Sequence, residues 1–121
     1  RVAAHHEDGL TELDANGLRL FLPRVRQDVA APLRVRIAAQ EVILSRNRPE
    51  GLSALNILPG TVDSIREGDG PGAIVSLDTA GGRVLARITR RSAEALGLAP
   101  GVSCFAVVKT VAIAREDVGG A

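Results

Sequence analysis

Three short segments combine hydroxyls, small residues and positively charged side chains at the ends of expected β-strands. They are residues 52–62 (Leu-Ser-Ala-Leu-Asn-Ile-Leu-Pro-Gly-Thr-Val), Arg87–Arg90 and residues 107–111 (Val-Val-Lys-Thr-Val). Strand ends expose backbone N–H groups that have no ladder partner, and converging N–H groups, hydroxyls and an ammonium bind a compact oxyanion well. The alternative is that these hydroxyls only satisfy nearby backbone groups.

Other patterns that could carry chemistry are weak. No G-x-x-x-x-G-K-[ST] phosphate loop is present, and the glycine-rich residues 68–72 are typical of a hairpin turn before a strand. His5 and His6 could ligate a metal, but no cysteine or second histidine cluster supports them, so we interpret them as an exposed N-terminal pair. The acidic residues are scattered and no nucleophile lies beside a base. We therefore expect no catalytic residues, no metal site and no enzyme activity in this chain.

Composition limits the class of protein further. The chain has 121 residues, of which 45% are hydrophobic and 24% charged, which indicates one globular domain or two small β units sharing a core. Aromatic residues make up only 2%, so the stacking surfaces of single-stranded nucleic-acid binders are missing. The net charge is +1 and the basic residues are dispersed, so we expect no nucleic-acid partner.

The single cysteine and the chain start bear on cellular context. Cys104 is the only cysteine and lies in the apolar run 102–108, which predicts a buried, unreactive thiol and excludes an intramolecular disulfide. No stretch approaches the ~20 apolar residues that span a bilayer, and no signal peptide opens the chain. Residue 1 is Arg rather than Met, so we expect a fragment or a processed chain.

Strand patterns dominate the sequence and predict an all-β fold. Strands are expected at residues 18–22, 33–37, 42–44, 60–65, 73–77, 84–88, 104–108 and 111–114. Turns are expected at residues 8–9, 16–17, 68–72, 81–82 and 100–101. Many short strands with regular turns are typical of a barrel or a sandwich.

One short helix and an internal repeat refine this fold. Thr89 could cap a helix through Ser92–Leu96, with Gly97 ending it, which fits a small OB-like barrel. Residues 17–24 also echo residues 82–90, which predicts two related β units at 1–48 and 49–121, with the helix in the second. Coincidence between β sequences is the alternative.

The order of several separated motifs resembles the molybdate-binding Mop domains, as in molbindins. Ser53-Ala54-Leu55-Asn56 followed by Leu-Pro-Gly-Thr-Val resembles their Ser-Ala-Arg-Asn opening, and Ile88-Thr89, the helix ending in Leu-Gly-Leu and Val108-Lys109-Thr110 continue the pattern. This match spans about residues 50–116. Together with Val35–Val42, nearly the whole chain looks like the C-terminal TOBE-type tail of a molybdate ABC transporter ATP-binding subunit.

This resemblance implies an OB-like β barrel of the TOBE/Mop type, a homodimer, and molybdate or tungstate bound between copies. By position, Ser53 and Thr89 would donate hydroxyl hydrogen bonds, while Ala54 and Leu55 would donate backbone N–H groups. Lys109 would supply positive charge and Thr110 a further N–H or hydroxyl. Asn56 is interpreted as a local turn residue rather than an anion ligand. No cofactor other than this ligand is implied.

Leu55 departs from the resembling family. Many members have Arg at this place, and a guanidinium makes a strong charge-assisted bond to an oxyanion. Without it, the charge would come from Lys109 alone or from Arg87 or Arg90 of a neighbouring copy, or this copy would bind no anion. Gln40 falls opposite Lys109 in the proposed repeat, so we expect an anion site only in the second unit.

Three functions follow from the resemblance. The first is a regulatory domain of a molybdate import ABC transporter, whose parent subunit would bind ATP and contact the membrane subunits, in the cytoplasm and peripheral to the inner membrane. The second is a free-standing molbindin-type storage protein. The third is a docking tail without a ligand, which Leu55 keeps open.

Overall fold

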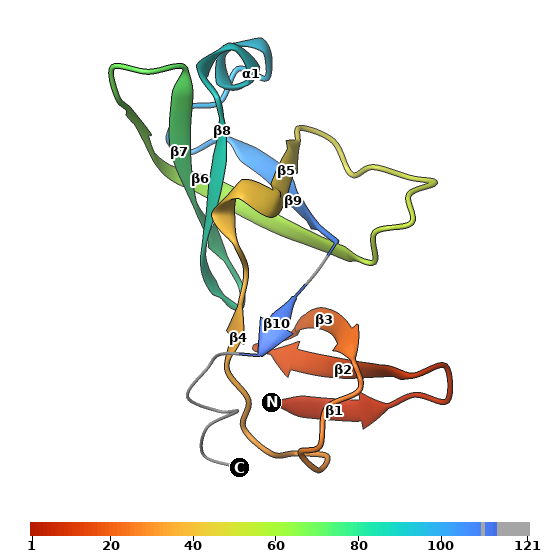
Figure 1. The fold of residues 1–121 in the computed structure, drawn as a ribbon. Helices are drawn as coiled ribbons and strands as arrows, with labels where there is room; N and C mark the ends of the chain where they lie inside the picture. Colours follow the sequence, from red (N-terminus) through yellow and green to blue (C-terminus); the bar gives the residue numbers. More distant parts are fainter. Residues whose placement is uncertain (110, 114–121) are drawn as a thin grey trace.

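The computed structural model describes residues 1–109 and 111–113, which contain ten β-strands, one α-helix and one 3-10 helix. The strands form a three-stranded sheet, a five-stranded sheet and a two-stranded ribbon between them (Figure 1). Every strand pair is antiparallel. The all-β prediction with one short helix is confirmed.

The N-terminal sheet has the order β1-β2-β3. Its strands are β1 (Val2–His5), β2 (Leu10–Ala15) and β3 (Leu18–Pro23). Asn16 and Gly17 join β2 to β3 with φ of 56° and 91°, as a two-residue type I′ turn requires, so the turn predicted there is confirmed. The sequence prediction missed β1 and β2, because a polar residue, Thr11, occupies a fully buried position beside Leu13 and hides the alternation.

The five-stranded sheet has the order β5-β9-β6-β7-β8. Its strands are β5 (Val42–Ser45), β6 (Asn56–Glu67), β7 (Gly72–Thr79), β8 (Gly82–Thr89) and β9 (Ser103–Val108). Strand β6 pairs with β9 through its first half and with β7 through its second half, and its register with β7 shifts at Val62–Ser64. The edge strands β5 and β8 contact each other, so the sheet curls as in an OB-like barrel.

A two-stranded ribbon ties the two sheets together. It pairs β4 (Val35–Arg36) with β10 (Ala112–Ile113), so the strand predicted at 33–37 is shorter than expected. After β4 the chain passes through the 3-10 helix η1 (Ala39–Glu41) into β5 of the other sheet, and after β9 it returns to β10. The backbone therefore crosses between the sheets twice, and the unit boundary predicted at residues 48 and 49 stays a prediction.

The single α-helix, α1 (Arg90–Ala95), is capped as the sequence predicts. Thr89 is the N-cap residue, and its side chain accepts a hydrogen bond from the backbone N–H of Ser92 at 3.0 Å. Gly97 follows with φ of 65°, the left-handed conformation that commonly ends helices. Among the described residues, no helix is long and apolar enough to cross a membrane.

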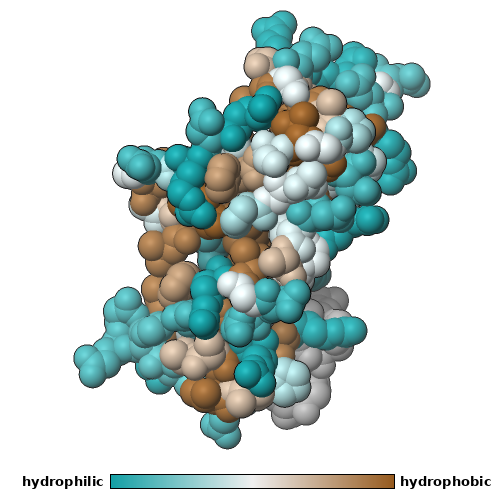
Figure 2. Space-filling model, turned by 180° about the vertical axis from the view of Figure 1, so that it is seen from behind, coloured by the Kyte–Doolittle hydropathy of each residue, from teal (hydrophilic) through white to brown (hydrophobic). Residues whose placement is uncertain are grey.

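One hydrophobic core runs through both sheets. Leu13, Leu20 and Leu22 of the N-terminal sheet belong to the same buried cluster as Leu58 and Val108 of the five-stranded sheet. Figure 2 shows apolar surface gathered at the waist between the upper and lower parts of the molecule. The shared core and the ribbon therefore fix the placement of the two sheets relative to each other.

Candidate oxyanion site

The loop that joins β5 to β6 ends in the predicted anion-binding residues. Ser53 and Leu55 are exposed and Ala54 is half-buried. Leu55 keeps 57% of its surface accessible, which is high for a large apolar residue. Because β6 begins at the next residue, Asn56, the backbone groups of Ser53, Ala54 and Leu55 lie outside the β6 ladder.

Lys109 lies at the same end of the five-stranded sheet. Asn56, the first residue of β6, is paired with Val108, the last residue of β9. Leu55 and Lys109 are therefore the first residues beyond one end of this ladder, and Lys109 is exposed. The register thus brings Leu55 and Lys109, which are distant in sequence, to one edge of the sheet.

A carboxylate lies at the same sheet end. On the far side of Val108 the ladder continues with Val42 of β5, and Glu41 precedes Val42. No ion pair of Lys109 is present within residues 1–109 and 111–113. Gln40, the predicted counterpart of Lys109, is exposed in η1 next to Glu41 rather than at a strand end of the N-terminal sheet.

Thr89 lies apart from this junction. It ends β8, and its hydroxyl donates to Ser92 Oγ at 3.0 Å while accepting the capping hydrogen bond. It borders a separate pocket of about 420 Å³ whose lining includes Ile43, Ile88 and Leu96 and excludes Ser53, Leu55 and Lys109. One copy of the chain therefore does not gather all the predicted ligands at one point.

Arg87 and Arg90 belong to the Thr89 end of the molecule. Arg87 is exposed on β8, opposite Ile74 in the ladder, and Ile74 is opposite Arg66 on its other side. Arg90 begins α1, and its backbone N–H donates to the carbonyl of Pro71 at 2.8 Å. Both lie in the same strand-to-helix segment as Thr89, not at the junction of Leu55 and Lys109.

The interpretation of Asn56 as a local turn residue is wrong. Asn56 is 1% exposed and begins β6. Its Oδ1 accepts the backbone N–H of Phe21 at 2.7 Å, and its Nδ2 donates to the carbonyl of Phe21 at 2.9 Å. The side chain therefore joins the two sheets, a role that no local pattern predicts because Phe21 is distant in sequence.

The remaining predicted residues need brief comment. Thr110 lies outside the described residues. His5 is half-buried in β1, with ring nitrogens 2.9 Å from Thr11 Oγ1 and 2.8 Å from the carbonyl oxygen of Gln27. His6 Nε2 lies 2.9 Å from Glu12 Oε1. The two histidines are therefore tied into the N-terminal sheet, which corrects their interpretation as an exposed pair.

Cys104 is buried in β9, as predicted, with 1% of its surface accessible. Burial raises the pKa of the Cys104 thiol, because desolvation disfavours the thiolate, and the nearby Arg46 guanidinium offsets this only in part. The thiol is therefore protonated at neutral pH and is shielded from reagents.

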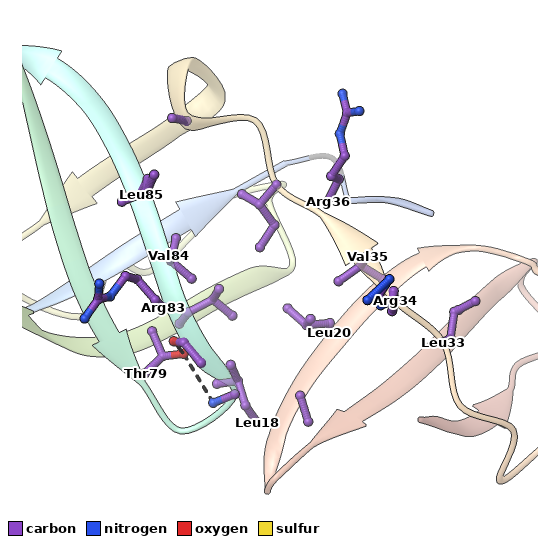
Figure 3. A pocket seen from close by; sticks show the side chains of 16 residues that line it. Leu18, Leu20, Leu33, Arg34, Val35, Arg36, Thr79, Arg83, Val84 and Leu85 are labelled. Atoms are coloured by element: carbon purple, nitrogen blue, oxygen red, sulfur yellow. Dashed lines mark hydrogen bonds between the residues drawn. The ribbon is translucent and has the colours of Figure 1, made fainter. Parts of the chain in front are cut away.

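A cavity at the waist was not predicted from the sequence. It has a volume of about 760 Å³ and lies between β3, the β4 segment and the β7–β8 hairpin. In Figure 3, Leu18, Leu20 and Val35 surround the space, while the guanidinium groups of Arg36 and Arg83 extend away from it. Only the assembled tertiary structure creates this space, since its lining comes from four separate segments.

The fold and the strand-end chemistry define a small OB-like accessory β domain, and the family model that matches gives this class its name. The model for the TOBE domain matches residues 52–114, which is just over half of the chain. The chain belongs to the TOBE domain family.

Curated relatives extend the likeness to nearly the whole chain. The Molybdenum import ATP-binding protein ModC of Mesorhizobium japonicum is 46% identical over 120 residues, covering 98% of this chain and 32% of the relative. The ModC of Aromatoleum aromaticum is 44% identical over 116 residues, covering 95% of this chain and 31% of the relative. The chain thus spans about a third of the length of these relatives.

A solved structure shares both the fold and recognisable sequence. The cytoplasmic molybdate-binding protein ModG, crystallised with molybdate bound, matches with a TM-score of 0.76 and 26% identity over 87% of this chain and 84% of that chain. This match includes both sheets, because it covers far more than the five-stranded sheet alone. The predicted resemblance to the TOBE/Mop class and its OB-like fold is confirmed.

Proposed function

We propose that this chain is the oxyanion-binding regulatory domain of a molybdate import ATP-binding subunit, with molybdate or tungstate as its ligand. The observation that carries the proposal is the pairing of Asn56 with Val108, which sets the Ser53–Leu55 loop beside Lys109. The likeness to a protein solved with molybdate bound supports molybdate or tungstate as the anion.

The ligand contacts follow from the positions of these residues. Ser53 would donate its hydroxyl, Ala54 and Leu55 their backbone N–H groups, and Lys109 its ammonium, with Thr110 adding a donor. Hydrogen bonds from several neutral donors together with one cation can hold a tetrahedral dianion. One cation leaves the dianion incompletely neutralised, so we expect weaker binding than in relatives that have Arg at the position of Leu55.

Thr89 would complete the site from a second copy of the chain. Its separation from the Leu55–Lys109 junction, and its place beside Arg87 and Arg90, support a composite site between two copies in a homodimer. In such a site Thr89, together with the guanidinium of Arg87 or Arg90, would supply the donors and the charge that one copy lacks. The hydroxyl of Thr89 would then exchange its bond to Ser92 Oγ for one to the anion.

Such a site suits regulation. A ligand shifts an equilibrium between two arrangements only by its differential affinity for them, and a site completed by two copies exists in one arrangement only. In the parent subunit, which would bind ATP and contact membrane subunits at the cytoplasmic face of the inner membrane, bound molybdate would favour one placement of the two domains. The units at 1–48 and 49–121 would differ in role, with the anion bound only by the second.

A docking tail without a ligand is the second candidate, and exposed Leu55 favours it, because an apolar side chain replaces the expected cation. Isothermal titration of the chain with molybdate, tungstate and sulfate separates the two functions. We expect heat with molybdate and tungstate and less with sulfate, at protein concentrations where a dimer forms. The absence of heat with all three anions would reject the regulatory function in favour of docking.

A further inference from the structure

The side chain of Asn56 stands in for a missing strand at the edge of the N-terminal sheet. β3 is an outer strand of that sheet, and the N–H and carbonyl of Phe21 both point to Asn56 rather than to a neighbouring strand. An amide carries an acceptor oxygen and a donor nitrogen on separate atoms, so it can bond to an N–H and a carbonyl at once, as a backbone partner does. With Asn56 only 1% exposed and Phe21 half-buried, both bonds are partly shielded from water.

The chemistry of this contact makes it selective for asparagine. Asp at the same position could accept from the Phe21 N–H but would set an oxygen against the Phe21 carbonyl. An apolar residue would leave the N–H and carbonyl of Phe21 without hydrogen-bond partners. Each unsatisfied buried polar group lowers the free energy of unfolding by about 1–3 kcal/mol. A contact that depends on orientation in this way fixes the angle and register between the sheets more tightly than apolar packing does.

One arm of the candidate anion site is bonded to the N-terminal sheet by this contact, and the other arm leads into the two-stranded ribbon. Asn56 follows Leu55 directly. The loop that carries Ser53 therefore ends at the residue that is hydrogen-bonded to Phe21. On the other arm, Val111 lies two residues after Lys109, is 3% exposed, and precedes β10, which pairs with β4. The Asn56–Phe21 contact therefore ties the Ser53–Leu55 arm directly to β3 of the N-terminal sheet.

We infer that Asn56 is a positioning residue that couples the anion site to the N-terminal sheet, an inference that rests on the proposed function. Asn56 does not touch the anion. It sets the Ser53–Leu55 backbone against Lys109 by holding β6 to β3, and anion binding tightens the same contact. Binding of an anion is then felt in the N-terminal sheet, which we expect to carry no anion site of its own.

The test compares two variants that each remove the hydrogen bonds of one buried side chain. Asn56→Leu removes the contact with Phe21, and Thr11→Val is its matched control, because Thr11 is 0% exposed and accepts the N–H of Val25 at 3.1 Å within the N-terminal unit. We expect Asn56→Leu to weaken molybdate binding about tenfold or more, and Thr11→Val to leave the Kd unchanged despite a similar loss in Tm. Titration calorimetry and thermal unfolding measure both quantities.

Amide hydrogen exchange on the unaltered chain gives a second reading that does not depend on a variant folding. Saturating molybdate should slow exchange of the Phe21 amide several-fold, while the Val25 amide exchanges at its former rate. If the unaltered chain binds molybdate but Phe21 exchange is unchanged, or folded Asn56→Leu binds as tightly as the unaltered chain, the coupling is rejected and the proposed function stands. If the unaltered chain binds no oxyanion, both are rejected.

Discussion

Asn56 of β6 and Val108 of β9 face each other in the five-stranded sheet, and this pair sets Leu55 and Lys109 side by side beyond the ladder. The two residues differ in their expected effect on an anion at this end of the sheet, because Leu55 is apolar and Lys109 is cationic. Under the proposed function, the balance between them would determine how tightly an oxyanion is held.

Replacing Leu55 with Arg should strengthen molybdate binding about tenfold, because a guanidinium adds a charge-assisted hydrogen bond at the loop end. Leu52→Arg is the control, since Leu52 is also exposed, at 48%, and precedes the predicted ligands. Titration calorimetry with molybdate measures the difference. Equal gains in both variants would mean a general charge effect and would argue against the placement of the site at Leu55.

Removing the Lys109 ammonium should weaken molybdate binding about tenfold or more, while the fold persists, because Lys109 is exposed and follows the end of β9. Ser53→Ala should weaken molybdate binding less, because it removes only one hydrogen bond from a neutral donor. Arg91→Ala removes an exposed charge on α1 and serves as the control for Lys109→Ala. Binding that is insensitive to Lys109→Ala at low salt would show that the anion sits elsewhere.

Thr89→Ala should lower the free energy of unfolding by about 1 kcal/mol, because it removes the cap of α1. Thr89→Ser keeps a hydroxyl that can accept the Ser92 N–H, so it should retain most of this stability. Urea unfolding of the two variants measures the effect in the absence of any anion. Equal losses for Ser and Ala would contradict the capping role and point to the methyl group instead.

Gly81→Ala should destabilise the contact between the sheets by about 1–3 kcal/mol through overpacking. A Cβ at this position would lie 3.0 Å from both the Cβ of Ala15 and the Cδ2 of Leu18, in the hairpin of the N-terminal sheet. Gly70→Ala is the control, since a Cβ there meets nothing within 4 Å. A melting temperature equal to that of Gly70→Ala would show that the contact between the sheets accommodates the added methyl group without loss of stability.

The Cys104 thiol should react with a chromogenic disulfide reagent far more slowly in the folded chain than in urea. Its folded pKa is raised by burial, so the stability it contributes is present below the unfolded pKa and is lost as pH rises through the folded value. Unfolding free energy should therefore fall at alkaline pH, and Cys104→Ala should remove that part of the decline. A pH dependence identical in the two proteins would contradict this assignment.

Local patterns predicted most of the five-stranded sheet and its helix, because alternation, turn residues and the Thr89 cap act over a few residues. They overestimated the strand at 33–37, where the partner β10 pairs with only two residues. They missed β2 because buried Thr11 is polar. Where tertiary burial overrides residue type, alternation in the sequence is a poor guide.

The candidate site could be predicted by its segments but not by its assembly. Ser53, Thr89 and Lys109 were each identified from strand ends and family resemblance, yet their mutual placement depends on the ladder register, which no local signal specifies. The role of Asn56 depends on a contact with Phe21, and the waist cavity depends on four segments meeting. Such features are set by long-range pairing rather than by any one stretch of sequence.

The double crossing of the backbone at the waist has a consequence for modularity. The five-stranded sheet receives β5 from chain that comes from the N-terminal sheet, and the β4–β10 ribbon pairs a segment before β5 with a segment after β9. A cut between residues 48 and 49 would separate β5 from the rest of its sheet. We therefore expect heating to melt the two sheets in one cooperative step rather than as separate units.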